Sequence, residues 1–338
     1  MTISRKVFLT GMAAICGAVA LPTIASAADV TIRLAHETRP GDPAFFAAEA
    51  FKKEVEAKSN GAIEVKVFPS AQLGNNRKLF AQIQSGAVDM TFTPLNLLSD
   101  IEPALNVTAA GYMFPSWEDM DAVLKAPEFG QKWFNTVLEK GGLRVLSAFY
   151  YGTRNLTTTD KPVRKPSDLA GLKIRAVPNP MSLANVKGLG GAPTPVAWPE
   201  TYQALRQGTV DGQENPIPVL YSAKLHEVQK YLTRTNHQMS SLPFLIKESS
   251  FAKLSDEHKA IISTAAVNAA QVGTDGMIKF TASLVDELKA KGVTIIDLSE
   301  AERNEFRDSV RAVLRNEVDG KAIPAGLIDE TAKFIAAR

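Results

Sequence analysis

The stretch Gly171-Leu-Lys-Ile-Arg175 predicts a short apolar strand that ends in an arginine, and Asp211-Gly-Gln-Glu-Asn-Pro216 follows farther along the chain. An arginine in this position offers a planar, permanently charged guanidinium that matches a carboxylate with two parallel hydrogen bonds. The segment therefore indicates a small organic acid as the ligand. Nothing in the chain suggests chemistry on that acid.

On both sides of this strand, short apolar runs alternate with helical patterns, which is the order typical of an α/β protein. The strands expected are Val30–Ala35, Ile63–Phe68, 88–93, 145–151 and 172–177, and the helices expected between the first three are 44–58 and 77–84. The chain becomes mainly helical after Pro243. We expect a two-lobed fold in which segments cross between the lobes more than once, because no low-complexity linker separates them.

Two helix starts in the second half carry clear capping signals. Ser255 precedes a helical run that reaches about Lys289, with Gly273 and Gly276 as places where the helix could kink. Ser299-x-x-Glu302 is a capping box for a further helix that reaches about Val318. These signals predict helix starts from local hydrogen bonding alone.

The first 27 residues predict an export signal. A basic start is followed by an apolar run over 7–21, too short to span a bilayer comfortably, and by the A-x-A site Ala25-Ser-Ala27. We therefore expect a mature protein that starts near Ala28 and is released into the periplasm. Cleavage would remove Cys16, the single cysteine of the chain, so disulfides and thiol chemistry are not expected.

The charge balance of the expected mature chain is even. The signal contains Arg5 and Lys6, so the 38 Lys+Arg of the chain fall to 36, against 36 Asp+Glu. A neutral balance argues against a nucleic-acid partner, which would need a strongly basic face. The remaining length is enough for two domains with cores of their own.

No catalytic or metal-binding pattern is present in the sequence. His36, His226, His237 and His258 lack the spacing of zinc ligands, and no G-x-S-x-G motif occurs. The glycines of Gly188-Leu-Gly190-Gly191 are followed by Ala-Pro rather than by a helix start, so this segment predicts a turn and not a phosphate loop. We expect no metal, no cofactor and no enzymatic activity.

Residue pattern alone leaves the role of the polar candidates open. Arg175 either pairs with a carboxylate of the protein such as Glu214 or binds the carboxylate of a ligand, since an unpaired buried charge is costly. The same two possibilities hold for Arg154. Asn215 precedes a proline, which favours a turn, although its amide has a donor and an acceptor for a ligand. Trp198 is either a core anchor or the wall of a pocket.

The longer motifs around these residues resemble those of one protein family. The chain resembles the DctP-type substrate-binding proteins of tripartite ATP-independent periplasmic (TRAP) transporters across essentially its whole mature length. The resemblance rests on Phe68-Pro-Ser-Ala-Gln-Leu-Gly74, Gly152-Thr-Arg154, residues 166–175, residues 191–216, which include Pro195-Val-Ala-Trp198-Pro-Glu200-Thr-Tyr202 and Asp211-Gly-Gln-Glu-Asn-Pro216, and Glu227-Val-Gln-Lys-Tyr231.

The resemblance implies a Venus-flytrap fold in which an organic acid lies between two lobes joined by crossing strands and a long helix. It implies a first lobe of residues 28–151 with about 241–280 and a second of 152–240 with about 281–338. It also implies a monomer that delivers its ligand to the membrane subunits of a TRAP permease. By resemblance Arg175 pairs with the ligand carboxylate, and the other expected ligand-binding residues are Arg154, Asn215, Trp198, His36, Asn76, Thr93, Pro94 and Tyr151.

The ligand is left open. Compared with sialic-acid binders, the sequence Thr93-Pro-Leu-Asn-Leu97 lacks the glutamate and arginine that those proteins have there, which argues against sialic acid. Tyr151, Leu97 and Trp198 favour a smaller or more apolar 2-oxo, aromatic or branched acid, whereas Asn76, Gln72 and His36 suit the hydroxyls of a sugar acid. A secreted α/β enzyme acting on an organic acid and a binding protein that serves a sensor are the alternative functions.

Overall fold

A computed structural model describes residues 28–338, and the expected export signal therefore lies outside the described residues. One mixed sheet forms the centre of the molecule, in the order β2-β1-β3-β8-β4-β7-β5-β6, with β9 beside β8. Its strands are β1 Val30–Ala35, β2 Ile63–Phe68, β3 Met90–Phe92, β4 Leu143–Thr158, β5 Lys173–Ala176, β6 Ala192–Pro195, β7 Gly212–Pro216, β8 Tyr231–Lys247 and β9 Thr294–Ile296. The α/β prediction is confirmed.

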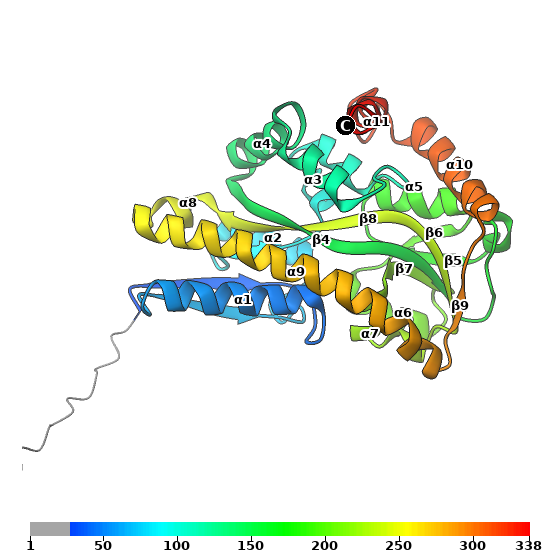
Figure 1. Ribbon diagram of the computed structural model, residues 1–338, viewed down its shortest axis with the longest axis horizontal. Helices are drawn as coiled ribbons and strands as arrows, with labels where there is room; N and C mark the ends of the chain where they lie inside the picture. The colour runs from blue at the N-terminus through cyan, green and yellow to red at the C-terminus, as the bar shows by residue number, and fades with distance from the viewer. Residues whose placement is uncertain (1–27) are drawn as a thin grey trace, which may run out of the picture.

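Helices cover the sheet and fill the connections between its strands (Figure 1). They are α1 Pro43–Lys58, α2 Asn76–Ser85, α3 Trp117–Lys125, α4 Lys132–Gly141, α5 Pro180–Leu189, α6 Thr201–Arg206, α7 Ile217–Ser222, α8 Glu248–Ala252, α9 Asp256–Ala290, α10 Glu300–Glu317 and α11 Leu327–Ala336. None of the helices in the described part of the chain is both long and apolar enough to cross a membrane.

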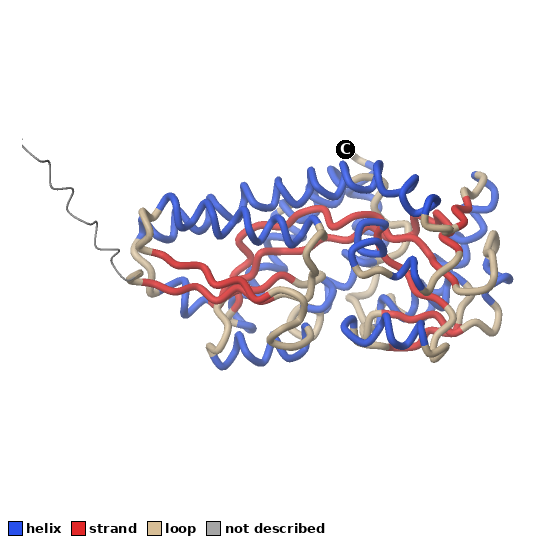
Figure 2. Tube along the Cα trace, turned by 90° about the horizontal axis from the view of Figure 1, so that it is seen from below, coloured by secondary structure: helices blue, strands red, loops and turns tan. Residues whose placement is uncertain are grey.

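Two long strands join the two ends of the sheet. β4 and β8 are antiparallel to each other along most of their length, and they separate β1, β2 and β3 from β5, β6 and β7 (Figure 2). Strands β1, β2 and β3 are parallel to one another, as are β5, β6 and β7. This arrangement produces the two-lobed architecture with crossing strands that was expected from the sequence.

The capping signals predicted helix starts correctly. The side chain of Ser255 accepts a hydrogen bond from the N–H of His258 at the start of α9, and Ser299 and Glu302 form the expected capping box of α10. The segment Gly188-Leu-Gly190-Gly191 was predicted to be a turn, and this is only partly correct, because Gly188 is the penultimate residue of α5. Gly190 then ends the helix in the left-handed conformation, with φ of 104°.

Helix α9 contributes to two of the hydrophobic cores. Its first half packs Ile262, Ala266 and Ala269 into the core that contains Phe51, Phe149 and Phe244, and its second half packs Leu284 and Leu288 against α6 and α7.

The division of the chain into lobes at the predicted residues stays a prediction. Helix α11, expected in the second lobe, places the ring of Phe334 5.2 Å from that of Phe129, which was expected in the first.

The glycines of α9 do not interrupt it, because α9 is continuous from Asp256 to Ala290. Gly273 instead allows close packing: a Cβ atom there would lie 2.7 Å from Cδ2 of the buried Phe149 ring. At Gly276 the nearest atom would be Cβ of Pro43, at 3.1 Å. The two positions therefore differ in the room that they leave for a side chain.

We expect Gly273→Ala to destabilise the protein by about 1–3 kcal/mol through overpacking, less the gain in helix propensity of about 1 kcal/mol. Gly276→Ala is the matched control, with a similar gain in propensity and a lighter contact. Urea unfolding should give a lower midpoint for Gly273→Ala than for Gly276→Ala. Equal midpoints would show that the Phe149 ring can move aside.

Candidate functional site

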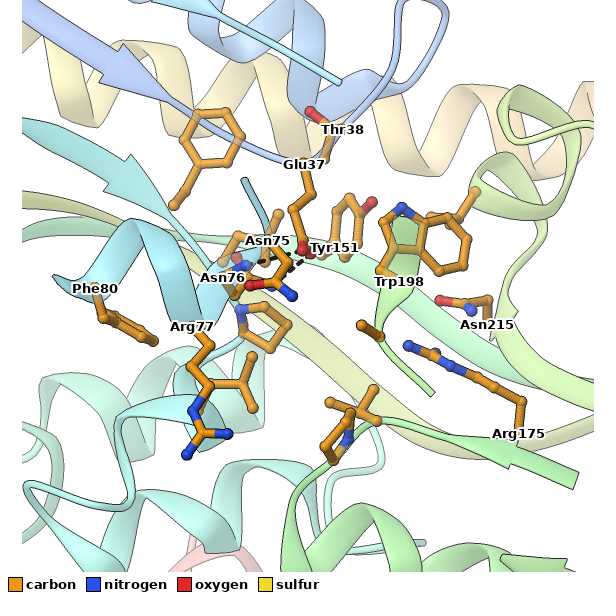
Figure 3. Close-up of a pocket in the computed structure, with 18 of the residues that line it drawn as sticks. Glu37, Thr38, Asn75, Asn76, Arg77, Phe80, Tyr151, Arg175, Trp198 and Asn215 are labelled. Carbon is orange, nitrogen blue, oxygen red and sulfur yellow. Dashed lines mark hydrogen bonds between the residues drawn. The ribbon is translucent and has the colours of Figure 1, made fainter. Parts of the chain in front are cut away.

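A cavity of about 470 Å³ lies between the part of the sheet formed by β1, β2 and β3 and the part formed by β5, β6 and β7. Its lining comes from the segments that follow β1, β3 and β5, from the start of α2, and from β4 and β7 (Figure 3). Ligands of open α/β sheets are bound beyond the carboxyl ends of parallel strands, and this volume is within the roughly 300–1,000 Å³ usual for small-molecule pockets. The expected residues that line it are Asn76, Pro94, Tyr151, Arg154, Arg175, Trp198 and Asn215.

Arg175 is a fully buried arginine in the wall of this cavity. Its Nε donates to the backbone oxygen of Val196 at 2.9 Å, and its guanidinium carbon lies 5.6 Å from the centre of the Trp198 ring. Burial lowers its pKa to about 10, so the side chain stays charged at neutral pH. Within residues 28–338, no carboxylate lies close enough to form an ion pair with Arg175. The remaining guanidinium N–H groups are thus available to a bound anion.

Glu214 pairs with the other arginine of the cavity. Arg154 forms an ion pair with Glu214 through Nε, and its Nη2 donates to Oε1 of Glu214 at 2.8 Å and to the backbone oxygen at 2.6 Å. The alternative in which Glu214 neutralises Arg175 is therefore wrong. Sequence could not decide this, because both arginines end up beside the same buried acid.

His237 completes the network around Glu214. Its Nε2 lies 3.2 Å from Oε2 of Glu214, and its Nδ1 lies 2.8 Å from Oγ1 of Thr235. Burial alone would raise the pKa of Glu214, but the charge of Arg154 and the hydrogen bonds from His237 and Arg154 lower it to about 2. Glu214 is thus ionised, and it holds Arg154 in place.

An irregularity in β4 aims two of its side chains at the same cavity. Tyr151 and Arg154 are three residues apart, and side chains at that spacing point to opposite faces of a regular strand. The register of β4 against β8 shifts between Tyr150 and Thr153, and Gly152 adopts φ of 93°. A Cβ atom at Gly152 would lie 2.7 Å from Cβ of Pro216. The glycine therefore permits both the bulge and the close approach of β7.

The aromatic and amide candidates are held by their own contacts. The Tyr151 hydroxyl donates to Oδ2 of Asp42 at 2.9 Å, so the tyrosine offers mainly its ring to the cavity. Nδ2 of Asn215 donates to Oε1 of Gln213 at 2.6 Å. Trp198 is half-buried, and its ring lies beside Arg175 and Asn215 in Figure 3. These contacts fix the shape of the wall around Arg175.

Two expected residues lie behind the cavity wall. His36 is buried, its ring is stacked on that of Phe92 at 4.5 Å, and its Nδ1 lies 2.7 Å from Oγ1 of Thr38. Burial lowers the pKa of His36 to about 3, so the ring is neutral. Thr93 is also buried and does not line the cavity. Their part in ligand binding stays a prediction.

Glu37 lines the cavity and was missed in the sequence. The backbone N–H of Asn76 donates to its Oε1 at 2.9 Å, and Nδ2 of Asn76 donates to its Oε2 at 2.6 Å. Burial raises the pKa of Glu37 to about 7, although the bond from Asn76 and the charge of Arg175 act in the opposite direction. Its only sequence signal is an acid at the end of a predicted strand. Among the described residues, no cluster of His, Cys, Asp and Glu is arranged to hold a metal ion.

Comparison with known proteins identifies many relatives of this chain. The family model of DctP, bacterial extracellular solute-binding protein family 7, matches residues 34–320. A solute-binding protein of Roseobacter denitrificans is 34% identical over 92% of this chain and 95% of its own length. The 2,3-diketo-L-gulonate-binding periplasmic protein YiaO of Escherichia coli is 30% identical over 96% of this chain and 95% of its own.

Solved structures show the same architecture. A TRAP periplasmic solute-binding protein of Roseobacter denitrificans with bound L-galactonate has a TM-score of 0.83 at 30% identity, and covers 92% of this chain and 99% of its own. One of Polaromonas bound to D-erythronate has a TM-score of 0.81 at 29% identity, over 91% and 98%. One of Ochrobacterium anthropi with bound L-fuconate has a TM-score of 0.84 at 29% identity, over 91% and 100%.

We expect Glu214→Gln to destabilise the protein by about 3–5 kcal/mol at pH 7, because it leaves the buried charge of Arg154 without its partner. The pKa of Glu214 is lower in the folded protein than in the unfolded chain, so its contribution is present above about pH 4.5 and is lost as the pH falls toward 2. Urea unfolding at pH 7 and pH 3 should thus show a smaller difference between wild type and variant at pH 3.

Glu317→Gln is the matched control for that measurement. Glu317 pairs with Lys187 on the surface, and exposed pairs contribute about 0–1 kcal/mol. An effect of Glu214→Gln as small as that of Glu317→Gln would contradict a structural role for the buried network.

Proposed function

Because the chain belongs to the DctP family of bacterial extracellular solute-binding proteins, we propose that it captures a small organic acid for a TRAP transporter. The ligand carboxylate pairs with Arg175 inside the cavity, and the loaded protein delivers it to the membrane subunits of the permease. Residues 1–27 export the protein to the periplasm, where this capture takes place.

The observation that carries this proposal is the buried charge of Arg175. A buried guanidinium without an ion-pair partner is costly, and a ligand carboxylate in the cavity supplies the missing charge. The planar guanidinium can donate two parallel hydrogen bonds to the two carboxylate oxygens. Trp198 covers one side of that carboxylate, and Asn215 supplies an amide beside it.

Arg154 acts mainly as a positioning residue in this scheme. Its ion pair with Glu214 commits most of its donors, so it adds positive potential to the cavity more than direct bonds. The ligand touches residues on both sides of the cavity and thus favours the closed arrangement of the lobes, because these contacts are complete only there. Capture and closure follow from differential affinity alone.

Thermal denaturation against a panel of organic acids tests the proposal. A ligand that binds only the folded state raises its stability by about 4 kcal/mol at a concentration 1,000 times its dissociation constant. The protein should first be unfolded and refolded to remove co-purified ligand. The neighbours with bound galactonate, erythronate and fuconate support sugar acids as the first compounds to add. A folded protein that responds to no carboxylate would contradict the proposal.

We expect Arg175→Ala to weaken binding of the identified acid by about 2–5 kcal/mol, the usual cost of removing one side of a buried charged pair. Arg175→Lys should also bind poorly, because an ammonium group cannot reproduce the planar fork. Isothermal titration calorimetry measures both variants.

Arg77→Ala is the control, since Arg77 is an exposed arginine that lines the same cavity. It should retain most of the affinity. If both Arg175 variants bind as tightly as the wild-type protein, the ligand carboxylate is held elsewhere.

A further inference from the structure

We propose that Glu37, fixed by Asn76, is a specificity-determining residue that accepts a hydroxylated monocarboxylate and rejects an acid with a second carboxylate. This inference rests on the function proposed above, with Arg175 holding the first carboxylate. It names the class of substrate: a sugar acid with a single acidic end, and neither a dicarboxylate nor an acid with an apolar tail.

The first observation is the geometry of the Glu37 carboxylate. Both of its oxygens accept a hydrogen bond from Asn76, one from the backbone N–H at 2.9 Å and one from Nδ2 at 2.6 Å. These two bonds hold the carboxylate in one orientation. Each carboxylate oxygen can accept about two hydrogen bonds, so one acceptor site on each oxygen is left for a ligand hydroxyl.

The second observation is the position of Glu37 relative to Arg175. Both residues line the same cavity, and Figure 3 places Glu37 and Asn76 on one side of it and Arg175 with Trp198 on the other. A ligand whose carboxylate binds Arg175 therefore extends its other end toward Glu37. The two ends of the cavity have opposite charge, and they demand different chemistry from the two ends of the ligand.

The other charged groups around the cavity do not neutralise Glu37. Within residues 28–338, Glu37 takes part in no ion pair, and the neighbouring His36 is neutral. Arg77 and Asp100 are exposed and lie at the rim.

Arg154 and Asp42 have partners of their own. Arg154 is paired with Glu214, and Asp42 accepts the hydroxyl of Tyr151 and the N–H of Ala44. In the proposed binding mode, the ligand carboxylate neutralises Arg175.

A second carboxylate beside Glu37 would place two negative charges together, and one of them would have to take up a proton. A hydroxyl group instead donates to Glu37. An apolar end would leave the second acceptor site of each Glu37 oxygen desolvated and without a donor. The pKa of Glu37 is raised to about 7, so the required proton is taken up readily below pH 7 and with increasing difficulty above it. Binding of a dicarboxylate should therefore weaken about tenfold per pH unit above 7, because it is linked to one proton.

The test compares L-galactonate with galactarate, which has the same carbon chain and differs in carrying a carboxylate where L-galactonate has its terminal CH₂OH. Isothermal titration calorimetry measures both acids at pH 6 and pH 8, where both are fully ionised. We expect L-galactonate to bind several-fold more weakly at pH 6 than at pH 8, because protonation of Glu37 removes its charged acceptor. We expect galactarate to bind at least about 100-fold more weakly than L-galactonate at pH 8. The affinity for galactarate itself should be about tenfold higher at pH 6 than at pH 8.

Glu37→Gln removes the charge and keeps the shape, and the side-chain amide of Asn76 can turn to match it. In this variant the affinity for galactarate should become independent of pH, and that for L-galactonate should fall about tenfold through the loss of charged acceptors. Asp100→Asn removes the same charge from the rim of the same cavity and should leave the pH dependence of galactarate binding unchanged.

Equal affinity of the wild-type protein for the two acids, or the same ratio at pH 6 and pH 8, would overturn the inference and leave the proposed function intact. Binding of neither acid would overturn the inference together with the sugar-acid class. If Glu37→Gln does not fold, the pH dependence of the wild-type protein decides alone.

Discussion

The cavity contains two buried arginines, Arg154 and Arg175, and its electrostatics depend on which of them the buried acid Glu214 neutralises. Glu214 is bonded to Arg154 and to His237, and Arg175 is left with a backbone oxygen and the face of Trp198. The positive charge that remains at Arg175 supports the proposal that the ligand carboxylate binds there. Burial strengthens this interaction, because the attraction between charges is larger away from water.

The backbone determines where these charges lie. Arg154 and Glu214 are on β4 and β7, which pair in the register Arg154 with Pro216 and Leu156 with Glu214. The bulge at Gly152 then turns Tyr151 toward the same cavity, although a regular strand would point it away. A local departure from strand geometry is thus as important to the cavity as the polar residues themselves, and Gly152 lies between the two residues, Tyr151 and Arg154, that it brings to the cavity.

The parts of the fold that could be predicted from sequence are those with a local cause. Strands Val30–Ala35 and Ile63–Phe68 were predicted to the residue, and the starts of α9 and α10 followed from Ser255 and Ser299. Strand β4 extends well beyond the predicted 145–151, because its far half gains its partners from β7 and β8, which are distant in sequence.

The site residues that belong to sequence motifs could be predicted, whereas the ion pairs and hydrogen bonds between residues distant in sequence could not. The motifs brought Arg175, Trp198 and Asn215 to one cavity, but they could not assign Glu214 to one of two arginines. Glu37 was missed although the adjacent His36 and its partner Asn76 were expected at the site, because Asn76 is 39 residues away and the contact between the two is not visible in the sequence. That contact exists only once β1 and α2 have been brought together.

Helix α9 has a mechanical consequence for the molecule as a whole. It is 35 residues long, so it extends for about 50 Å at 1.5 Å per residue, and it is packed in the cores of both ends of the sheet. If the two halves of the molecule move apart as proposed, α9 bends or Leu284 and Leu288 lose part of their packing. The stiffness of α9, which does not line the cavity, would then limit how far the two halves separate when the ligand leaves.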